Sequence, residues 1–185
     1  MKKFLQLIIC LISLSLSAQT SSINTVLSTS SQLHLSFTTS EIELTSISNR
    51  DEVYTQLTVA GCTKPYDVGN PDLPVFSKLI EVPSTGNISI ELVSSNVLVS
   101  DLASLGYAQE VIPSQASIFK NQEPLKTTFV YNENTYTKDA FYSQELISIE
   151  RLGSMRGKSI ARLQIAPLAY NPLSNELRVQ KNIEF

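Results

Sequence analysis

The 185-residue sequence has no tryptophan, a single histidine, two cysteines and few charged residues. Charged side chains make up 17% of the chain, the formal net charge is −3, and no basic cluster is present that could meet phosphates. Because proteins that bind nucleic acids concentrate Lys and Arg on one face, this composition excludes a nucleic-acid partner. The hydrophobic content of 42% is ordinary, so a chain of this length can form one domain with a substantial core.

Residues 1–18 have the organisation of a signal peptide. Lys2 and Lys3 precede an apolar run over 4–16 that is too short to span a bilayer, and small residues surround Ala18. We predict cleavage near Ala18 and export of the remaining chain. Removing Lys2 and Lys3 takes the net charge from −3 to −5. No later stretch is long and apolar enough to span a membrane.

The shortage of cysteine and histidine restricts the chemistry that the exported chain could perform. Cys10 leaves with the signal peptide, so only Cys62 remains and no internal disulfide can form. A nucleophilic Cys62 would need His34 as its base, and a small buried cysteine on a strand is the favoured interpretation. One His and one Cys cannot close a zinc site without carboxylates at ligand spacing. We predict no catalytic residue, no metal site and no cofactor.

Apolar residues recur with the two-residue period of β-strands, whereas helix caps and 3.6-residue stripes are nearly absent. Turns rich in Gly, Pro and Asn separate short strands, which is typical of a sandwich or barrel. We predict an all-β fold: an antiparallel β-sandwich or barrel-like domain with short turns and little helix. Strands are expected at 41–47, 54–60, 145–152, 158–165 and 176–185.

Residues 69–83 are the stiffest part of the chain. Pro71 and Pro74 fix their own φ angles and push the preceding residues to extended geometry, so this part leads stiffly into a strand over 75–82. Pro83 ends that strand. A turn over 84–87 and alternation over 88–92 then predict a hairpin, which 96–99 would continue as part of the same sheet.

Residues 19–49 are rich in Ser and Thr and low in charge. Two interpretations stay open for residues 20–40. It is either a linker or contains an edge strand at 32–38, where Leu33, Leu35 and Phe37 alternate with polar residues.

Residues 111–126 lack the regular alternation of apolar and polar residues that marks the predicted strands. Pro113 and Pro124 bracket residues 114–123. We predict an exposed, extended loop that carries Lys120 and Lys126. Flanking prolines would lower the entropy cost of ordering such a loop against a partner.

Three groups of residues, in order along the chain, resemble one family. They are Gly69-x-Pro71-x-Leu73-Pro74 with Ile80-x-Val82-Pro83; Tyr136-x-x-Asp139-Ala140-Phe141-Tyr142; and Arg156-Gly157 with Ile165-x-Pro167-x-x-Tyr170-Asn171-Pro172. Residues 50–185 resemble the N-terminal propeptide of gingipain-type (family C25) cysteine peptidases.

The resemblance implies a β-sandwich that docks beside the active site of a peptidase domain carrying the catalytic Cys and His. It also implies that a surface loop presents a basic side chain to the pocket for the substrate residue before the cut. Lys120 is the first candidate for that side chain and Lys126 the second, although each is also explained as an ordinary solvated charge. Parent proteins of this kind pass through the periplasm of Bacteroidetes-type bacteria to the cell surface or medium.

On this basis we expect a signal peptide (1–18), a Ser/Thr-rich segment (19–49) and a propeptide domain (50–185) that is cut short at its C-terminal end. The expected function is latency inhibitor and folding aid for a cognate peptidase domain that would follow in cis. The alternative is a free-standing exported β-sandwich for adhesion or ligand binding, which the missing Trp disfavours. Arg156-Gly157 could be a processing site, but a plain turn is the favoured interpretation. Asp139 could be a catalytic acid, but a turn or cap role is favoured.

Overall fold

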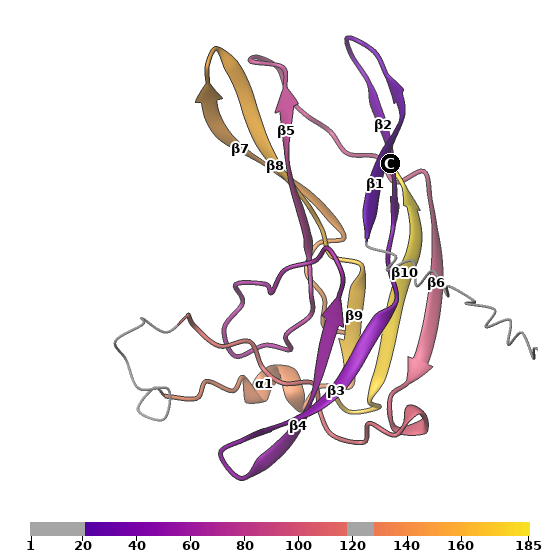
Figure 1. Cartoon of the computed structure of the whole chain (residues 1–185), viewed down its shortest axis with the longest axis vertical. Coiled ribbons are helices and arrows are strands. Elements are labelled where there is room, and N and C mark those ends of the chain that lie inside the picture. Colours follow the sequence, from indigo (N-terminus) through magenta and orange to yellow (C-terminus); the bar gives the residue numbers. More distant parts are fainter. Residues whose placement is uncertain (1–20, 118–127) are drawn as a thin grey trace, which may run out of the picture.

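The computed structural model describes residues 21–117 and 128–185, which form a two-layered sandwich of antiparallel strands (Figure 1). One layer is a five-stranded sheet in which β10 (Glu176–Glu184) pairs with three neighbours. Its strands run in the order β1 (Ser22–Ser28), β2 (Leu33–Thr38), β10 and β6 (Ser94–Asp101), and β9 (Leu168–Asn171) also pairs with β10.

The opposite layer consists of two smaller sheets. A three-stranded sheet has the order β5 (Phe76–Val82), β8 (Lys158–Ile165) and β7 (Ile147–Met155), and a hairpin joins β3 (Ile42–Asn49) to β4 (Glu52–Val59). The helical elements of the described residues are a 3₁₀ turn (Ala103–Leu105) and the one-turn helix α1 (Glu133–Tyr136).

The prediction of an all-β antiparallel sandwich is therefore confirmed. No helix in the described ranges is long and apolar enough to cross a membrane.

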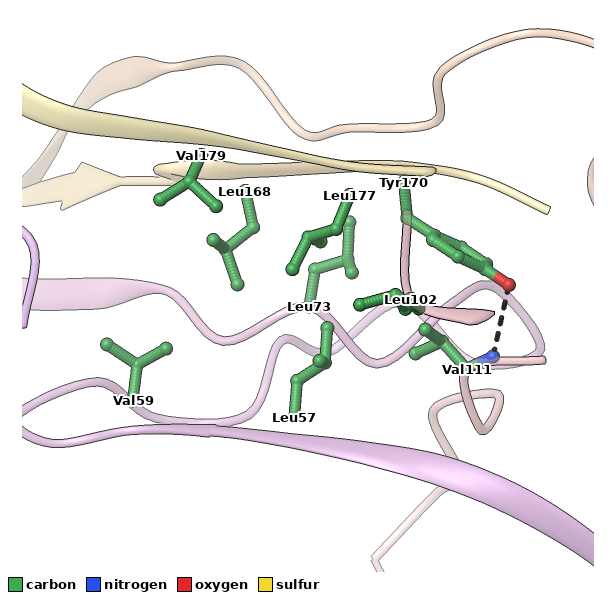
Figure 2. Close-up of a cluster of buried hydrophobic side chains, with 9 residues drawn as sticks. All are labelled: Leu57, Val59, Leu73, Leu102, Val111, Leu168, Tyr170, Leu177 and Val179. Atoms are coloured by element: carbon green, nitrogen blue, oxygen red, sulfur yellow. Dashed lines mark hydrogen bonds between the residues drawn. The ribbon is translucent and has the colours of Figure 1, made fainter. Parts of the chain in front are cut away.

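Two hydrophobic clusters join the layers, and β10 contributes to both. Figure 2 shows the first, in which Leu177 and Val179 of β10 face Leu57 and Val59 of β4. In the second, Ile183 of β10 packs with residues of β2 and of the three-stranded sheet, which are Leu35, Phe37, Phe76, Ile147, Leu163 and Ile165. Apolar residues at alternate positions of β10 thus hold both halves of the sandwich together.

The predicted hairpin over 75–92 is wrong. The first strand forms as β5, but it pairs with β8 in the register Phe76↔Ile165. Residues 83–93 leave β5 without forming a strand, and β6 pairs with β10 in the opposite layer. Arg151 of β7 donates to the carbonyls of Pro83 (2.6 Å) and Gly86 (2.8 Å), which holds the departing chain against the three-stranded sheet. Alternation predicts extended backbone without specifying its partner, so the crossover could not be read from it.

The segment 21–49 is fully integrated into the sandwich rather than serving as a linker. The strand expected at 32–38 forms as β2, but it lies between β1 and β10 and is not an edge strand. Phe37 is completely buried, and its ring centroid lies 4.9 Å from that of Phe76 in the other layer.

Substitution of Phe37 tests whether the first strands are part of the cooperative unit. Phe37→Ala should lower the free energy of unfolding by about 3–5 kcal/mol, because it removes a fully buried ring and leaves a cavity. Urea denaturation followed by far-UV circular dichroism measures this change. The matched control is Val26→Ala in β1, where the side chain is 56% exposed and the expected loss is below about 0.5 kcal/mol. Similar losses for both variants would place β2 outside the cooperative core.

Candidate functional site

The predicted loop has a first stem, residues 111–117, and a second stem, residues 128–136, and both meet the turn at Gly69-Asn70. The Gly69 N–H donates to the Ser114 carbonyl (2.8 Å), and the Ser114 N–H donates to the Asn70 carbonyl (2.7 Å). On the other side, the Asn132 N–H donates to the Gly69 carbonyl (2.9 Å). Two consecutive residues therefore fix the backbones of both stems.

Gly69 has to be glycine for two reasons. Its φ is +91°, which L side chains rarely adopt, and an added Cβ would lie 3.0 Å from Cγ1 of Val130. A side chain at this position would strain the turn and would force Val130 of the second stem to shift by a few tenths of an ångström.

The Asn70 side chain uses both of its polar atoms in this junction. Its Oδ1 accepts hydrogen bonds from Asn132 Nδ2 (2.9 Å) and Thr135 Oγ1 (2.6 Å), and its Nδ2 donates to Asp67 Oδ1 (2.9 Å). Asn132 precedes α1 and Thr135 lies within it. Asn70 thereby fixes the start of α1 to the proline-rich segment.

Gln115 joins the two stems directly. The positions that it joins, 115 and 130, are nearer to the loop than positions 114 and 132, which Gly69 holds. Its Nε2 donates to the Val130 carbonyl (2.8 Å), and the Val130 N–H donates to its Oε1 (2.9 Å). One side chain therefore imitates the paired hydrogen bonds of an antiparallel strand. The junction of Gly69, Asn70 and Gln115 with both stems is called the loop base below.

The start of the predicted exposed loop is in fact buried, which corrects the interpretation of residues 111–114. Val111 is fully buried, Ser114 is 4% exposed, and Pro113 forms a bridge with Pro71. The Val111 N–H donates to Tyr170 Oη (3.4 Å, Figure 2), and the Val111 carbonyl accepts from Tyr136 Oη (2.7 Å). Proline content indicated an extended backbone here, but burial is decided by these long-range partners.

Tyrosines around the loop base act as neutral hydrogen-bond donors. The Tyr131 ring stacks on Tyr136 with centroids 4.4 Å apart, and Tyr131 Oη donates to Glu110 Oε2 (3.0 Å). Burial, followed by nearby carboxylates, raises the pKa of Tyr131 and Tyr136 well above the usual range for tyrosine. Burial also raises the pKa of Tyr54 and of Tyr170 to about 12 each.

Parts of the three quoted motifs, around Gly69, Tyr142 and Tyr170, lie close together in space although they are far apart in the sequence. Tyr142 and Tyr170 exchange backbone hydrogen bonds of 2.8 and 2.9 Å, and Asn171 Nδ2 donates to Asp139 Oδ1 (2.8 Å). Tyr142 Oη donates to an oxygen of Asp67, beside the Gly69 turn. The remaining motif positions shape the backbone or fill the core: Pro71, Leu73, Pro74, Pro167 and Pro172 are buried, and Pro83 follows β5.

Of the other predicted residues, one pair is not described by the structure and one pair lies away from the loop base. Lys120 and Lys126 lie outside the described residues. Arg156 and Gly157 form the turn between β7 and β8 with φ values of 52° and 79°, at the far end of the molecule from α1 (Figure 1). These positive angles suit the tight turn of a two-residue hairpin.

No catalytic arrangement is found for Cys62 or His34. Burial raises the pKa of the Cys62 thiol, which disfavours the thiolate, and its Sγ lies 3.8 Å from Ser21 Oγ. His34 Nε2 lies 3.8 Å from Glu184 Oε2. Within 21–117 and 128–185, no three His, Cys, Asp or Glu residues gather as a metal site would require.

Sequence reasoning missed Asn70 and Gln115 as organising residues. Asn70 stands at an unspecified position of the first motif, and Gln115 lies within the predicted loop. The turn propensity of Asn next to Gly was the available signal for Asn70, whereas no local pattern identifies Gln115.

Comparisons with known proteins agree on one family. The family model Propeptide_C25 matches residues 19–185. Lys-gingipain from Porphyromonas gingivalis is 35% identical over 153 residues, which cover 83% of this chain and 9% of the relative. Gingipain R1 from the same organism is 30% identical over 124 residues, covering 62% of this chain and 11% of the relative. The chain thus spans a small part of the length of the curated relatives it matches.

Two solved structures share the fold. A structure from work on the zymogenic latency of gingipain K from Porphyromonas gingivalis matches with a TM-score of 0.80 and 33% identity, covering 91% of this chain and 93% of that chain. The complex of the pro- and mature domains of RgpB from Porphyromonas gingivalis matches with a TM-score of 0.75, covering 88% and 80%. At 22% identity, the second match shows the fold alone.

Removing the Asn70 side chain should destabilise the loop base. Asn70→Ala loses three hydrogen bonds and leaves partners of the half-buried amide unsatisfied, which should cost about 1–3 kcal/mol of unfolding free energy. Urea denaturation measures the cost. The control Asn87→Ala alters an exposed residue after β5 and should be neutral within about 0.5 kcal/mol. If both variants were equally stable, Asn70 would not organise the junction.

The raised tyrosine pKa values make stability fall at alkaline pH. An acid whose pKa is higher in the folded state loses its proton more readily in the unfolded chain, so deprotonation favours unfolding. The contribution is complete below about pH 10, the ordinary tyrosine pKa, and is lost as pH rises toward about 12, the folded value for Tyr54 and Tyr170. Urea midpoints at about pH 8 and 11 should differ, with the lower midpoint at the higher pH. Equal midpoints would contradict these assignments.

Proposed function

This chain belongs to the Propeptide_C25 family, and from that premise we propose that it keeps an exported gingipain-type cysteine peptidase latent and assists the folding of that peptidase. The membership confirms the resemblance seen in the sequence. Inhibition and folding assistance are the parts of the role that we propose here. The peptidase domain is proposed to follow in the same polypeptide, and residues 1–18 are proposed to direct its export.

The observation that carries this proposal is the loop base. An inhibitory loop has to be presented at a fixed position, because every freedom lost on docking weakens binding. The backbone bonds of Gly69, the side chain of Asn70 and the two-sided bridge of Gln115 hold both stems before the loop begins. Such a base fixes where the two stems leave the domain, so docking does not have to order the stems themselves.

The proposed inhibitory side chain is Lys120, with Lys126 as second candidate. A lysine that enters an acidic specificity pocket forms a charge-assisted hydrogen bond worth about 1.5–3 kcal/mol. Both candidates are lysines, and a relative at 35% identity is named Lys-gingipain, which supports lysine as the residue presented.

Substitution of both lysines tests the mechanism. Lys120→Ala combined with Lys126→Ala should weaken inhibition of the cognate peptidase domain at least ~10-fold, because the charge-assisted contact is lost. The inhibition constant is measured with the isolated peptidase domain and added propeptide chain. Lys78→Ala is the matched control, since it removes an exposed lysine from β5.

The possible results separate the parts of the proposal. Equal inhibition by the double variant and the unaltered chain would remove both lysines from the mechanism. Absence of inhibition by the unaltered chain would overturn the latency role. Folding assistance is tested separately, by refolding the denatured peptidase domain with and without the chain and measuring the recovered activity.

A further inference from the structure

Phe129 lies in the second stem, close to the end that joins the loop, and its side chain is half-buried. Its ring centroid lies 5.9 Å from that of Tyr54, with 41° between the ring planes. The guanidinium carbon of Arg50 lies 5.9 Å from the same centroid. A ring that contacts both a second ring and a cation has a preferred orientation, because each contact depends on the direction of the ring. The β3–β4 hairpin therefore holds Phe129 through two of its residues.

The part of the hairpin that contacts Phe129 is held by its own bonds. Tyr54 is 5% exposed, and its Oη donates to a carboxylate oxygen of Glu52. The pairing of β3 with β4 is regular from its first residue pair to its last. Arg50 and Asp51 form the connecting turn with φ values of 51° and 75°, which suit a two-residue hairpin. The hairpin thus offers Phe129 a fixed surface.

The next residue of β4 holds the start of the first stem. The Thr55 N–H donates to the Glu110 carbonyl (2.8 Å), and the Ile112 N–H donates to the Thr55 carbonyl (2.9 Å). Thr55 is completely buried. Tyr54 and Thr55, which are adjacent in one strand, therefore contact both stems. This contact is separate from the loop base, which joins the same stems through other residues.

We propose that Phe129 is a positioning residue for inhibition, because its contact with the β3–β4 hairpin sets the direction in which the second stem meets the loop. The role of the loop in inhibition rests on the proposed function. Gln115 fixes this stem at the backbone of Val130, and Phe129 fixes it one residue nearer the loop. Lys126 precedes Phe129 by three residues, so their Cα atoms lie at most about 11 Å apart. Without the Phe129 contact, docking would have to order this end of the stem at a cost in affinity.

Hydrogen exchange of the Val130 amide tests the contact without any peptidase. This N–H donates to Gln115 Oε1 (2.9 Å), and Phe129→Ala should make its exchange at least ~10-fold faster, because the stem opens more often. Phe141→Ala is the matched control: Phe141 is also half-buried, lies outside both stems and has Arg178 Cζ 3.8 Å from its ring centroid. It should leave the exchange unchanged. Unchanged exchange in Phe129→Ala, or equal acceleration in both variants, would overturn the proposal.

Inhibition of the cognate peptidase domain tests the positioning role. Phe129→Ala should raise the inhibition constant at least ~10-fold, whereas Phe129→Tyr, which keeps the ring, and Phe141→Ala should stay within about threefold of the unaltered chain. Arg50→Asn removes the guanidinium but tolerates the positive φ of the turn, and should raise the constant about threefold. Unchanged inhibition by Phe129→Ala would overturn the positioning role. Where Phe129→Ala fails to fold, unchanged inhibition by Arg50→Asn would overturn it.

A double-mutant cycle separates positioning from a general structural effect. In a chain that already carries Lys120→Ala and Lys126→Ala, adding Phe129→Ala should raise the inhibition constant less than about threefold, because the positioned side chains are gone. A further ~10-fold loss in that background would show that Phe129 acts independently of the lysines and would overturn the proposal. Absence of inhibition by the unaltered chain would instead overturn the proposed function, and the positioning role with it.

Discussion

The burial of β10 in both hydrophobic clusters is the constraint on which the rest of the structure depends. Leu177 and Val179 belong to one cluster and Ile183 to the other, while the backbone of the same strand pairs with β2, β6 and β9. The two smaller sheets of the opposite layer have no pairing with each other. Their common support is the five-stranded sheet, so the position of each is set by its packing against β10 and its neighbours.

The loop base extends this framework to the surface by hydrogen bonding. Val111 and Tyr170 belong to the first cluster, and the bond between them fixes the beginning of the first stem (Figure 2). From there the Gly69-Asn70 turn connects both stems, and Gln115 bridges them once more. A continuous set of contacts therefore leads from the core to the point at which the loop begins.

The sequence predicted the extended segments well and their partners poorly. Alternation located β3, β4, β7, β8 and β10 to within a few residues, because a half-buried strand requires it. It failed for residues 83–93, since the same pattern suits a hairpin and a crossover. Burial of Val111 and the central position of β2 also depend on strands distant in sequence. The glycine and prolines of the sequence indicated a turn and extended backbone near the loop base. The contribution of Gln115 could not be predicted, because it depends on tertiary contacts alone.

The bonds of Asn70 have a kinetic consequence, because they join residues 62 and 65 positions apart. Contacts this distant in sequence form late, after the entropy of the intervening chain has been lost. A nascent chain has no rigid platform for its loop until the sandwich is nearly complete. The proposed occlusion of a peptidase cleft would therefore become possible as one of the last events of folding, together with the closing of the two layers.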